Sequence, residues 1–193
     1  MKTDIILSGV GGQGILSIAT IIGEAATHSG LHLKQAEVHG MSQRGGDVQS
    51  NLRLSDSPIA SDLIAQGTAD MILSLEPMEA LRYLPYLDRE GWIITSSAPF
   101  KNIPNYPDEQ ALKEELAQLP HIILVDVEKI AHEHNMPKCA NVILLGAASR
   151  YLGIVSVDEL RDSIARVFGS KGSAVVEMNQ KAFDLGYAAA ENK

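Results

Sequence analysis

The sequence is poor in cysteine, in aromatic residues and in positive charge, and each shortage excludes a class of function. A single cysteine among 193 residues excludes an internal disulfide, a zinc site made only of cysteines and a self-contained iron–sulfur cluster. Aromatic residues make up 5%, which argues against a stacking platform for single-stranded nucleic acid. Lys and Arg number 16 against 24 Asp and Glu, and the resulting net charge of −8 disfavours a nucleic-acid partner.

Long hydrophobic runs and targeting signals are also missing. No apolar stretch reaches the roughly 20 residues that span a membrane. The N-terminus Met1-Lys2-Thr3-Asp4 leads directly into an apolar run without the features of a signal peptide. These observations predict a cytoplasmic protein without a membrane partner. A hydrophobic content of 45% suffices for a sizeable core, and neither a repeat nor a long linker divides residues 1–193, so we expect one domain.

The apolar pattern predicts alternating strands and helices. Strands are predicted at residues 5–7, 31–38, 71–75, 92–95 and 121–126, and helices at 15–28, 77–87, 109–119 and through most of the chain after Val127. Residues 48–54 alternate apolar and polar side chains, which is typical of a half-exposed strand, and an antiparallel strand there would make the sheet mixed. We expect a three-layer α/β/α fold with a largely parallel, Rossmann-like sheet and a helical C-terminal portion.

A glycine-rich loop joins the first predicted strand to the first helix. Gly9-Val10-Gly11-Gly12-Gln13-Gly14 matches the G-x-G-x-x-G pattern of dinucleotide-binding folds. Residues without a Cβ let the backbone turn tightly, and the helix N-terminus adds about half a positive charge, so a phosphate is the natural ligand. In a dinucleotide site an acid about 20 positions onward holds the ribose, and Glu37 is the candidate. Three alternatives stay open: nicotinamide or flavin binding, binding of another phosphate or nucleotide, and close packing of helix on sheet.

A second polar loop follows the strand predicted at 31–38. The stretch Glu37-Val38-His39-Gly40-Met41-Ser42-Gln43-Arg44-Gly45-Gly46 places hydrogen-bonding side chains between glycines. Ligands of open α/β sheets bind beyond the carboxyl ends of strands, and Arg44 has the fork geometry to hold a phosphate or carboxylate through two hydrogen bonds. Ser42 and Gln43 have groups that can bond to a ligand or to a partner backbone. The alternative is a structured turn whose polar groups satisfy one another.

Other residues carry weaker indications of chemistry. His132 and His134 are two positions apart on a predicted helix, so they point to different sides, and no third metal ligand is in view. Cys139 opens an apolar helix and is expected to be a buried small side chain. Residues 169–173 lie between predicted helices and are expected to connect them. We therefore expect no metal site on this chain and assign no catalytic residue to it.

The two glycine-rich segments together resemble the gamma subunit, or domain III, of the 2-oxoacid:ferredoxin oxidoreductases that act on pyruvate, ketoisovalerate or indolepyruvate. The segments Asn141–Ala147 and Asn179–Phe183 lie where that family has similar ones, so the resemblance covers nearly the whole chain. A chain of this length without a ferredoxin-like cysteine segment is most similar to the small (beta) subunits of the indolepyruvate branch.

The resemblance implies a role inside a complex. Such complexes decarboxylate a 2-oxoacid on thiamine diphosphate, pass electrons through [4Fe–4S] clusters to ferredoxin and form an acyl-coenzyme A. The thiamine diphosphate, its Mg²⁺ and the clusters are carried by a large catalytic subunit. This chain is then expected to enclose the active site and to be inactive alone. A stand-alone nicotinamide- or nucleotide-binding protein stays the alternative. Whether the isolated chain forms a homodimer is left open by the sequence.

The residues predicted to face a cofactor come from the two loops. They are Gly9, Gly11, Gly12, Gln13, Gly14, Ser42, Gln43, Arg44 and Gly45. In the complex that the resemblance implies, they are expected to line the shared active-site cleft, near the phosphates of coenzyme A or thiamine diphosphate.

Overall fold

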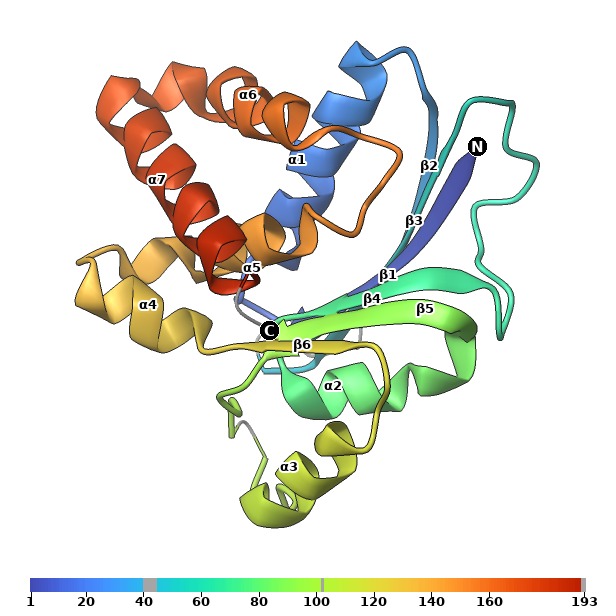
Figure 1. The fold of residues 1–193 in the computed structure, drawn as a ribbon, viewed down its shortest axis with the longest axis vertical. Helices are drawn as coiled ribbons and strands as arrows, with labels where there is room; N and C mark the ends of the chain where they lie inside the picture. The colour runs from blue at the N-terminus through green and yellow to red at the C-terminus, as the bar shows by residue number, and fades with distance from the viewer. Residues whose placement is uncertain (40–44, 102, 192–193) are drawn as a thin grey trace.

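The computed structural model describes residues 1–39, 45–101 and 103–191, which form three layers, a sheet between two groups of helices (Figure 1). In chain order the elements are β1 (Lys2–Val10), α1 (Ile15–His28), β2 (His32–His39), β3 (Asp47–Ser55), β4 (Ala69–Ser74), α2 (Pro77–Arg82), η1 (Leu84–Tyr86), β5 (Leu87–Ser96), α3 (Glu109–Ala117), β6 (Ile122–Val125), α4 (Val127–Glu133), η2 (Pro137–Cys139), α5 (Ala140–Ala148), α6 (Val157–Phe168), η3 (Gly169–Lys171) and α7 (Ser173–Ala189). The predicted α/β fold is confirmed. None of the helices in these ranges has the length and apolar character that a membrane crossing requires.

Six strands form one mixed sheet in the order β2-β3-β1-β4-β5-β6. β1, β4, β5 and β6 pair in parallel, whereas β3 pairs antiparallel with both β1 and β2. The antiparallel strand suggested by the alternation of residues 48–54 is therefore confirmed. The order β1, α1, β2 is that of a βαβ unit and β2 does run parallel to β1, but the two strands are not neighbours. β3 folds back along β2 and itself takes the place beside β1.

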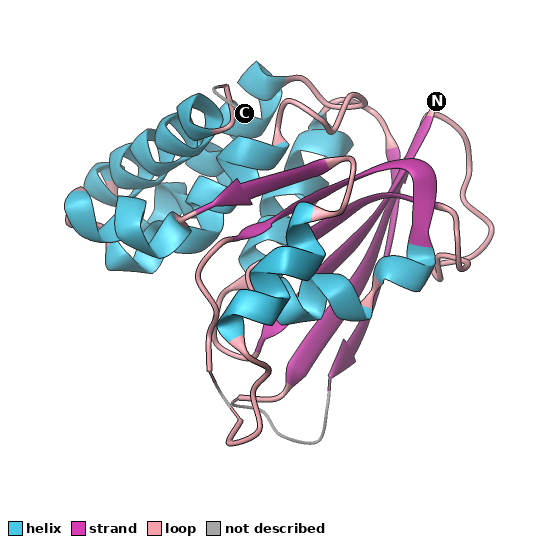
Figure 2. Ribbon diagram, turned by 60° about the horizontal axis from the view of Figure 1, so that its bottom comes forward, coloured by secondary structure: helices cyan, strands magenta, loops and turns pink. Residues whose placement is uncertain are grey.

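The two faces of the sheet bury cores of unequal size. Successive side chains of a strand point to opposite faces, so Ile5 and Leu7 of β1 belong to the large core under α1, α5, α6 and α7. Ile6 belongs to the smaller core under α2, together with Ile72 and Ile93. Figure 2 shows α2 and α3 on one side of the sheet and the other long helices on the opposite side. Burial on both faces explains why the strand at 5–7 is an unbroken apolar run.

α5 and α7 approach each other closely through one glycine on each helix. A Cβ atom on Gly146 would lie 2.0 Å from the carbonyl oxygen of Phe183, and one on Gly186 would lie 1.8 Å from that of Ile143. No larger residue permits this backbone approach. The segments Asn141–Ala147 and Asn179–Phe183, which carry part of the family resemblance, come together at this contact.

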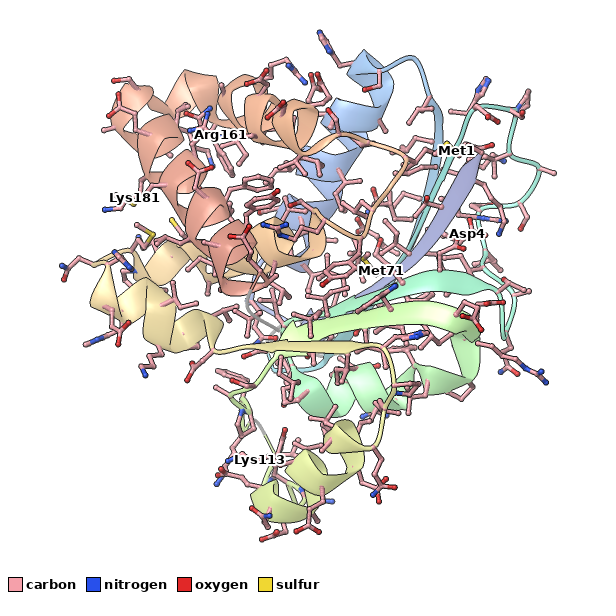
Figure 3. All side chains as sticks on the ribbon, in the orientation of Figure 1. Met1, Asp4, Met71, Lys113, Arg161 and Lys181 are labelled. Atoms are coloured by element: carbon pink, nitrogen blue, oxygen red, sulfur yellow. The ribbon has the colours of Figure 1, made fainter. Side chains whose placement is uncertain are left out.

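All the parallel strands end at the same edge of the sheet, where β3 begins, and we call it the carboxyl edge. Residues 11–14, 45–46, 75–76, 97–101 and 103–108 connect the elements there. Met1 and Asp4 mark the opposite, amino edge (Figure 3). In open α/β sheets ligands bind at the carboxyl edge, so the candidate site is built from these connections.

Candidate functional site

Gln13 ties the glycine loop between β1 and α1 together. The Val10 amide donates to the side-chain oxygen of Gln13 at 2.8 Å, and the Gln13 amide donates to the Val10 carbonyl oxygen at 3.1 Å. The Gln13 side-chain amide donates to the carbonyl oxygen of Leu75, after β4, at 3.3 Å. Gly9 leaves room for this side chain, because a Cβ there would lie 2.9 Å from Gln13 Oε1. Gln13 therefore anchors the loop to the end of the neighbouring strand.

Gly14 is the position of the loop where a glycine is required most clearly. Its φ of +88° lies in the left-handed region, and a Cβ there would lie 2.7 Å from Nδ2 of Asn141. Asn141, near the start of α5, donates from Nδ2 to the Gly14 carbonyl oxygen at 3.1 Å. This contact joins residues 127 positions apart. The only sequence signal for it is a polar residue that opens an apolar helix, and the role of Asn141 was not predicted.

Gly12 and the first turn of α1 are the part of the loop open to a ligand. Gly12 is exposed, and a Cβ there would meet no atom within 4 Å. The 14-residue helix α1 receives no side-chain hydrogen bond from its N-cap Gly14 and has no acidic residue in its first turn. The positive end of its dipole is therefore not neutralised within the helix, and it can stabilise an anion such as a phosphate.

The structure brings the two predicted loops together at the carboxyl edge. The Gly11 amide donates to the carbonyl oxygen of Gly46 at 2.8 Å. Gly45, just before this contact, has a φ of +79°, which favours glycine. Ser42, Gln43 and Arg44 lie outside the described residues, so their ligand contacts stay predictions.

Glu37 does not lie where a dinucleotide fold needs its ribose-binding acid. Because β3 separates β2 from β1, Glu37 is two strand spacings, about 10 Å, from β1. It pairs in register with Ser50 of β3, and its carboxylate accepts a hydrogen bond from the Gln35 side-chain amide at 2.7 Å. The ribose-binding acid that the dinucleotide interpretation requires is therefore not in position.

A buried carboxylate that sequence reasoning missed organises the next part of the edge. Glu76 follows β4 and has 0% of its surface exposed. It caps α2 by accepting from the Glu79 amide at 2.9 Å, and it also accepts from the Phe100 amide at 3.3 Å and from the Tyr106 hydroxyl. Three donors among the residues that the structure describes thus satisfy this carboxylate. The sequence signal for this cap is an acidic residue directly before a proline, because Pro77 occupies the first position of α2.

Groups around α2 have shifted pKa values. Burial raises the pKa of Glu79, and the hydrogen bond from Arg82 at 2.8 Å opposes that rise only in part. Burial, followed by the charge of Asp47, raises the pKa of Tyr83 to about 12. Burial and then the hydrogen bond to Glu76 raise the pKa of Tyr106. At neutral pH Tyr106 therefore carries the proton that it donates to Glu76.

The single thiol and the two histidines at the end of α4 do not form a reactive group. Cys139 is buried, as predicted, and burial raises the pKa of its thiol, which disfavours the thiolate needed by a nucleophile or a metal ligand. His132 and His134 are exposed. In the part of the chain that the structure describes, no three His, Cys, Asp or Glu side chains gather as a metal site. Residues 169–173 connect α6 to α7, as predicted.

Sequence comparison relates this chain to one enzyme family along nearly its whole length. The family model for pyruvate ferredoxin/flavodoxin oxidoreductase matches residues 4–189. The chain is 36% identical to the indolepyruvate oxidoreductase subunit IorB of Pyrococcus horikoshii, over 97% of this chain and 96% of that protein.

Solved structures share the fold. The gamma subunit of a keto/oxoacid ferredoxin oxidoreductase from Geobacter sulfurreducens has a TM-score of 0.71 and 25% identity, over 99% of both chains. A 2-oxoglutarate:ferredoxin oxidoreductase from Magnetococcus marinus, solved with 2-oxoglutarate, coenzyme A and succinyl-CoA, has a TM-score of 0.77 and 21% identity. This chain corresponds to 31% of that longer one. The same fold therefore occurs both as a whole chain and as one part of a larger polypeptide.

Proposed function

The chain belongs to the pyruvate ferredoxin/flavodoxin oxidoreductase family, and we propose that it acts as the small subunit of an indolepyruvate-type 2-oxoacid:ferredoxin oxidoreductase. The observation that carries the proposal is the match to an indolepyruvate oxidoreductase subunit over 97% of this chain and 96% of that protein. The chain is thus a small subunit of an oxidoreductase complex. A preference for an aryl 2-oxoacid such as indolepyruvate is the finer part of the proposal.

In this proposal the large and the small subunit have different parts in the reaction. A large catalytic subunit would bind thiamine diphosphate with Mg²⁺ and the [4Fe–4S] clusters. Thiamine diphosphate would supply the decarboxylation, which releases carbon dioxide from the 2-oxoacid, and the clusters would accept the two electrons. The electrons pass to ferredoxin and the acyl group passes to coenzyme A. The chemistry of this chain supports that division, because a cluster needs several thiolates and the one cysteine of the chain is buried with a raised pKa.

We further propose that the glycine loop faces a phosphate of coenzyme A or of thiamine diphosphate. Exposed Gly12 and the uncapped start of α1 support this placement. Ser42, Gln43 and Arg44 belong to the same proposal. Arg44→Ala in the assembled complex is expected to lower turnover or to raise the KM for coenzyme A, and unchanged kinetics would remove Arg44 from the site.

A stand-alone nicotinamide- or nucleotide-binding protein is not favoured. β3 separates Glu37 from the glycine loop strand, so the acid and the loop do not form the pair that holds a dinucleotide. A relative that this chain matches over 96% of its length is named as a subunit.

Reconstitution of the complex tests the proposed function. The chain and the large subunit of the same host are co-expressed and purified without oxygen, and the native mass is measured together with viologen-dye reduction by a panel of 2-oxoacids. We expect joint elution, and dye reduction that needs both chains and is fastest with indolepyruvate or phenylpyruvate. A chain that elutes alone and leaves dye reduction by the large subunit unchanged would contradict the proposal.

A further inference from the structure

A row of buried hydroxyl side chains crosses the α2 face of the sheet near the carboxyl edge. Ser8 of β1, Ser74 of β4 and Thr95 of β5 lie side by side in register, and each has 0% of its surface exposed. They come two positions after the isoleucines that these strands contribute to the small core, so they point to the same face. This face is therefore apolar in the middle of the sheet and polar towards the carboxyl edge.

The three hydroxyls of this row differ in their hydrogen bonding. The Ser74 hydroxyl donates to the Glu76 carbonyl oxygen at 2.7 Å and accepts from the Glu76 amide at 3.3 Å. Among the residues that the structure describes, the hydroxyls of Ser8 and Thr95 have no hydrogen-bond partner. Burying a polar group without a partner costs free energy, which is recovered when the group meets water. Two hydroxyls on this face therefore favour a state in which the face is open.

The helices that cover this row bury few apolar side chains. α2 contacts β1, β4 and β5, and α3 contacts α2. α2 and its C-cap provide two members of the small core, Ala80 and Tyr83, and α3 buries Leu112 and Leu116. On the opposite face α5 alone contributes four buried Val, Ile and Leu side chains to the large core. Because apolar burial is the main stabilising contribution, α2 and α3 are held to the sheet more weakly than α5.

We propose that α2 and α3 open from the sheet together, as a cover, at a lower free energy than unfolding of the whole chain, and that the hydroxyl row favours this opening. The Phe100 amide and the Tyr106 hydroxyl, which precede α3, both donate to Glu76 at the start of α2, so the two helices move as one unit. Residues 75–76, 97–101 and 103–108 lie in the connections of this cover at the carboxyl edge, so its opening changes the edge where the candidate site lies. The inference goes beyond the proposed function and needs no partner chain.

Hydrogen–deuterium exchange of the complete chain in rising, non-denaturing concentrations of urea tests the opening. Urea promotes each opening in proportion to the surface that it exposes. Relative to unstructured peptides, amides of α2 and α3 should exchange at least about tenfold faster than those of α5, with a shared urea dependence that is shallower than that of α5. A single rate and urea dependence for all three helices would show that the cover does not open separately. Exchange of α2 and α3 that differs between the two helices, or that does not respond to urea, would also contradict the proposal.

Replacements in the hydroxyl row test the cause of the opening. Ser8→Ala/Thr95→Val removes the two unpartnered hydroxyls without adding bulk, so exchange in α2 and α3 should slow about tenfold. The matched change Ser74→Ala removes the partnered hydroxyl of the same row and should speed that exchange about fivefold. Unchanged or faster exchange in the double variant would overturn the role of the hydroxyl row, since it would mean that internal water satisfies both groups. Thr95→Val alone, with an expected slowing of about threefold, gives the same comparison if the double variant fails to fold.

Discussion

At the amino edge of the sheet a buried acid is held by cations, whereas at the carboxyl edge a buried acid is held by neutral donors. Asp4, 1% exposed, accepts from the Arg53 guanidinium at 2.8 and 2.9 Å and from Lys2 at 2.7 Å. Glu76, 0% exposed, accepts from two backbone amides and the Tyr106 hydroxyl. A buried carboxylate thus stabilises each edge of the sheet, through ion pairs at the amino edge and through neutral hydrogen-bond donors at the carboxyl edge.

In the proposed function, the amino edge serves stability and the carboxyl edge serves function. Arg53 also donates to the carbonyl oxygens of Ser61 and Leu63, each at 3.0 Å, and thereby fastens residues 56–68 over the amino edge. The charge and the hydrogen-bond donors of Arg53 are therefore paired with groups of the same chain. At the carboxyl edge the hydrogen bonds tie the described loop residues together, whereas Gly12 is exposed and the start of α1 has no side-chain cap.

The largest effect on stability is expected from Asp4→Ala. The change leaves the half-buried Arg53 guanidinium without its carboxylate and should lower the free energy of unfolding by about 3 kcal/mol in urea titrations. The control Asp56→Ala removes an exposed pair with the N-terminal amine and should leave the free energy of unfolding close to that of wild type. Variants of equal stability, or a weaker complex for Asp4→Ala under conditions where it is folded, would break the distinction between the edges.

Glu76→Ala should have the next largest effect. It removes the cap of α2 and leaves the Phe100 amide and the Tyr106 hydroxyl without their acceptor, at a cost of about 2 kcal/mol. Unlike Asp4→Ala, it should also release the connection between β5 and α3, so limited proteolysis should cut there faster than in wild type. Asp184→Ala, which breaks an exposed pair with Arg161 between α6 and α7, is the matched control. Equal cleavage of wild type and Glu76→Ala would show that Glu76 does not hold this connection.

A smaller effect should separate two glycines of the same loop. Gly14→Ala combines a positive φ with a contact 2.7 Å from Asn141 Nδ2, and about 2 kcal/mol of stability should be lost. Gly12→Ala has a positive φ but no atom within 4 Å of the added Cβ, so about 1 kcal/mol is expected. Urea titrations of both variants measure the difference. Equal losses of stability would mean that the Asn141 side chain moves away from the added Cβ without an energetic cost.

Acidification should weaken the amino edge. Burial alone would raise the pKa of Asp4, but hydrogen bonds from Arg53 and Lys2 outweigh it and hold the pKa below its ordinary value of 3.8. A depressed pKa means that the contribution of Asp4 is complete above the ordinary value and is lost as the pH falls through the lowered one. Glu79 has the opposite sign, because burial raises its pKa and the folded state binds its proton more tightly.

Urea midpoints measured from about pH 6 to about pH 2 test this sign. Asp4→Asn cannot titrate at that position, so its midpoints should fall less than those of wild type over the acid end of the range. Parallel curves for the two proteins would contradict the assignment of the acid loss to Asp4.

Local pattern predicted the elements and the antiparallel strand, because burial and alternation are properties of consecutive residues. It did not predict that β3 lies between β1 and β2, since the order of strands depends on pairing between distant segments. It also missed the contact of Asn141 with Gly14 and the hydrogen bonds to Glu76 from Phe100 and Tyr106, which lie 24 and 30 positions away. The glycine loop was recognised, but the bracing role of the Gln13 side chain needs Leu75, 62 positions away.

Hydrogen–deuterium exchange of the free chain and of its complex with the large subunit tests the central claim most directly. We expect assembly to slow exchange at the carboxyl edge, in the first turn of α1 and in residues 97–101 and 103–108, while residues 56–68 at the amino edge exchange as before. Protection confined to the amino edge, or no change at the carboxyl edge in a complex of the expected mass, would contradict it.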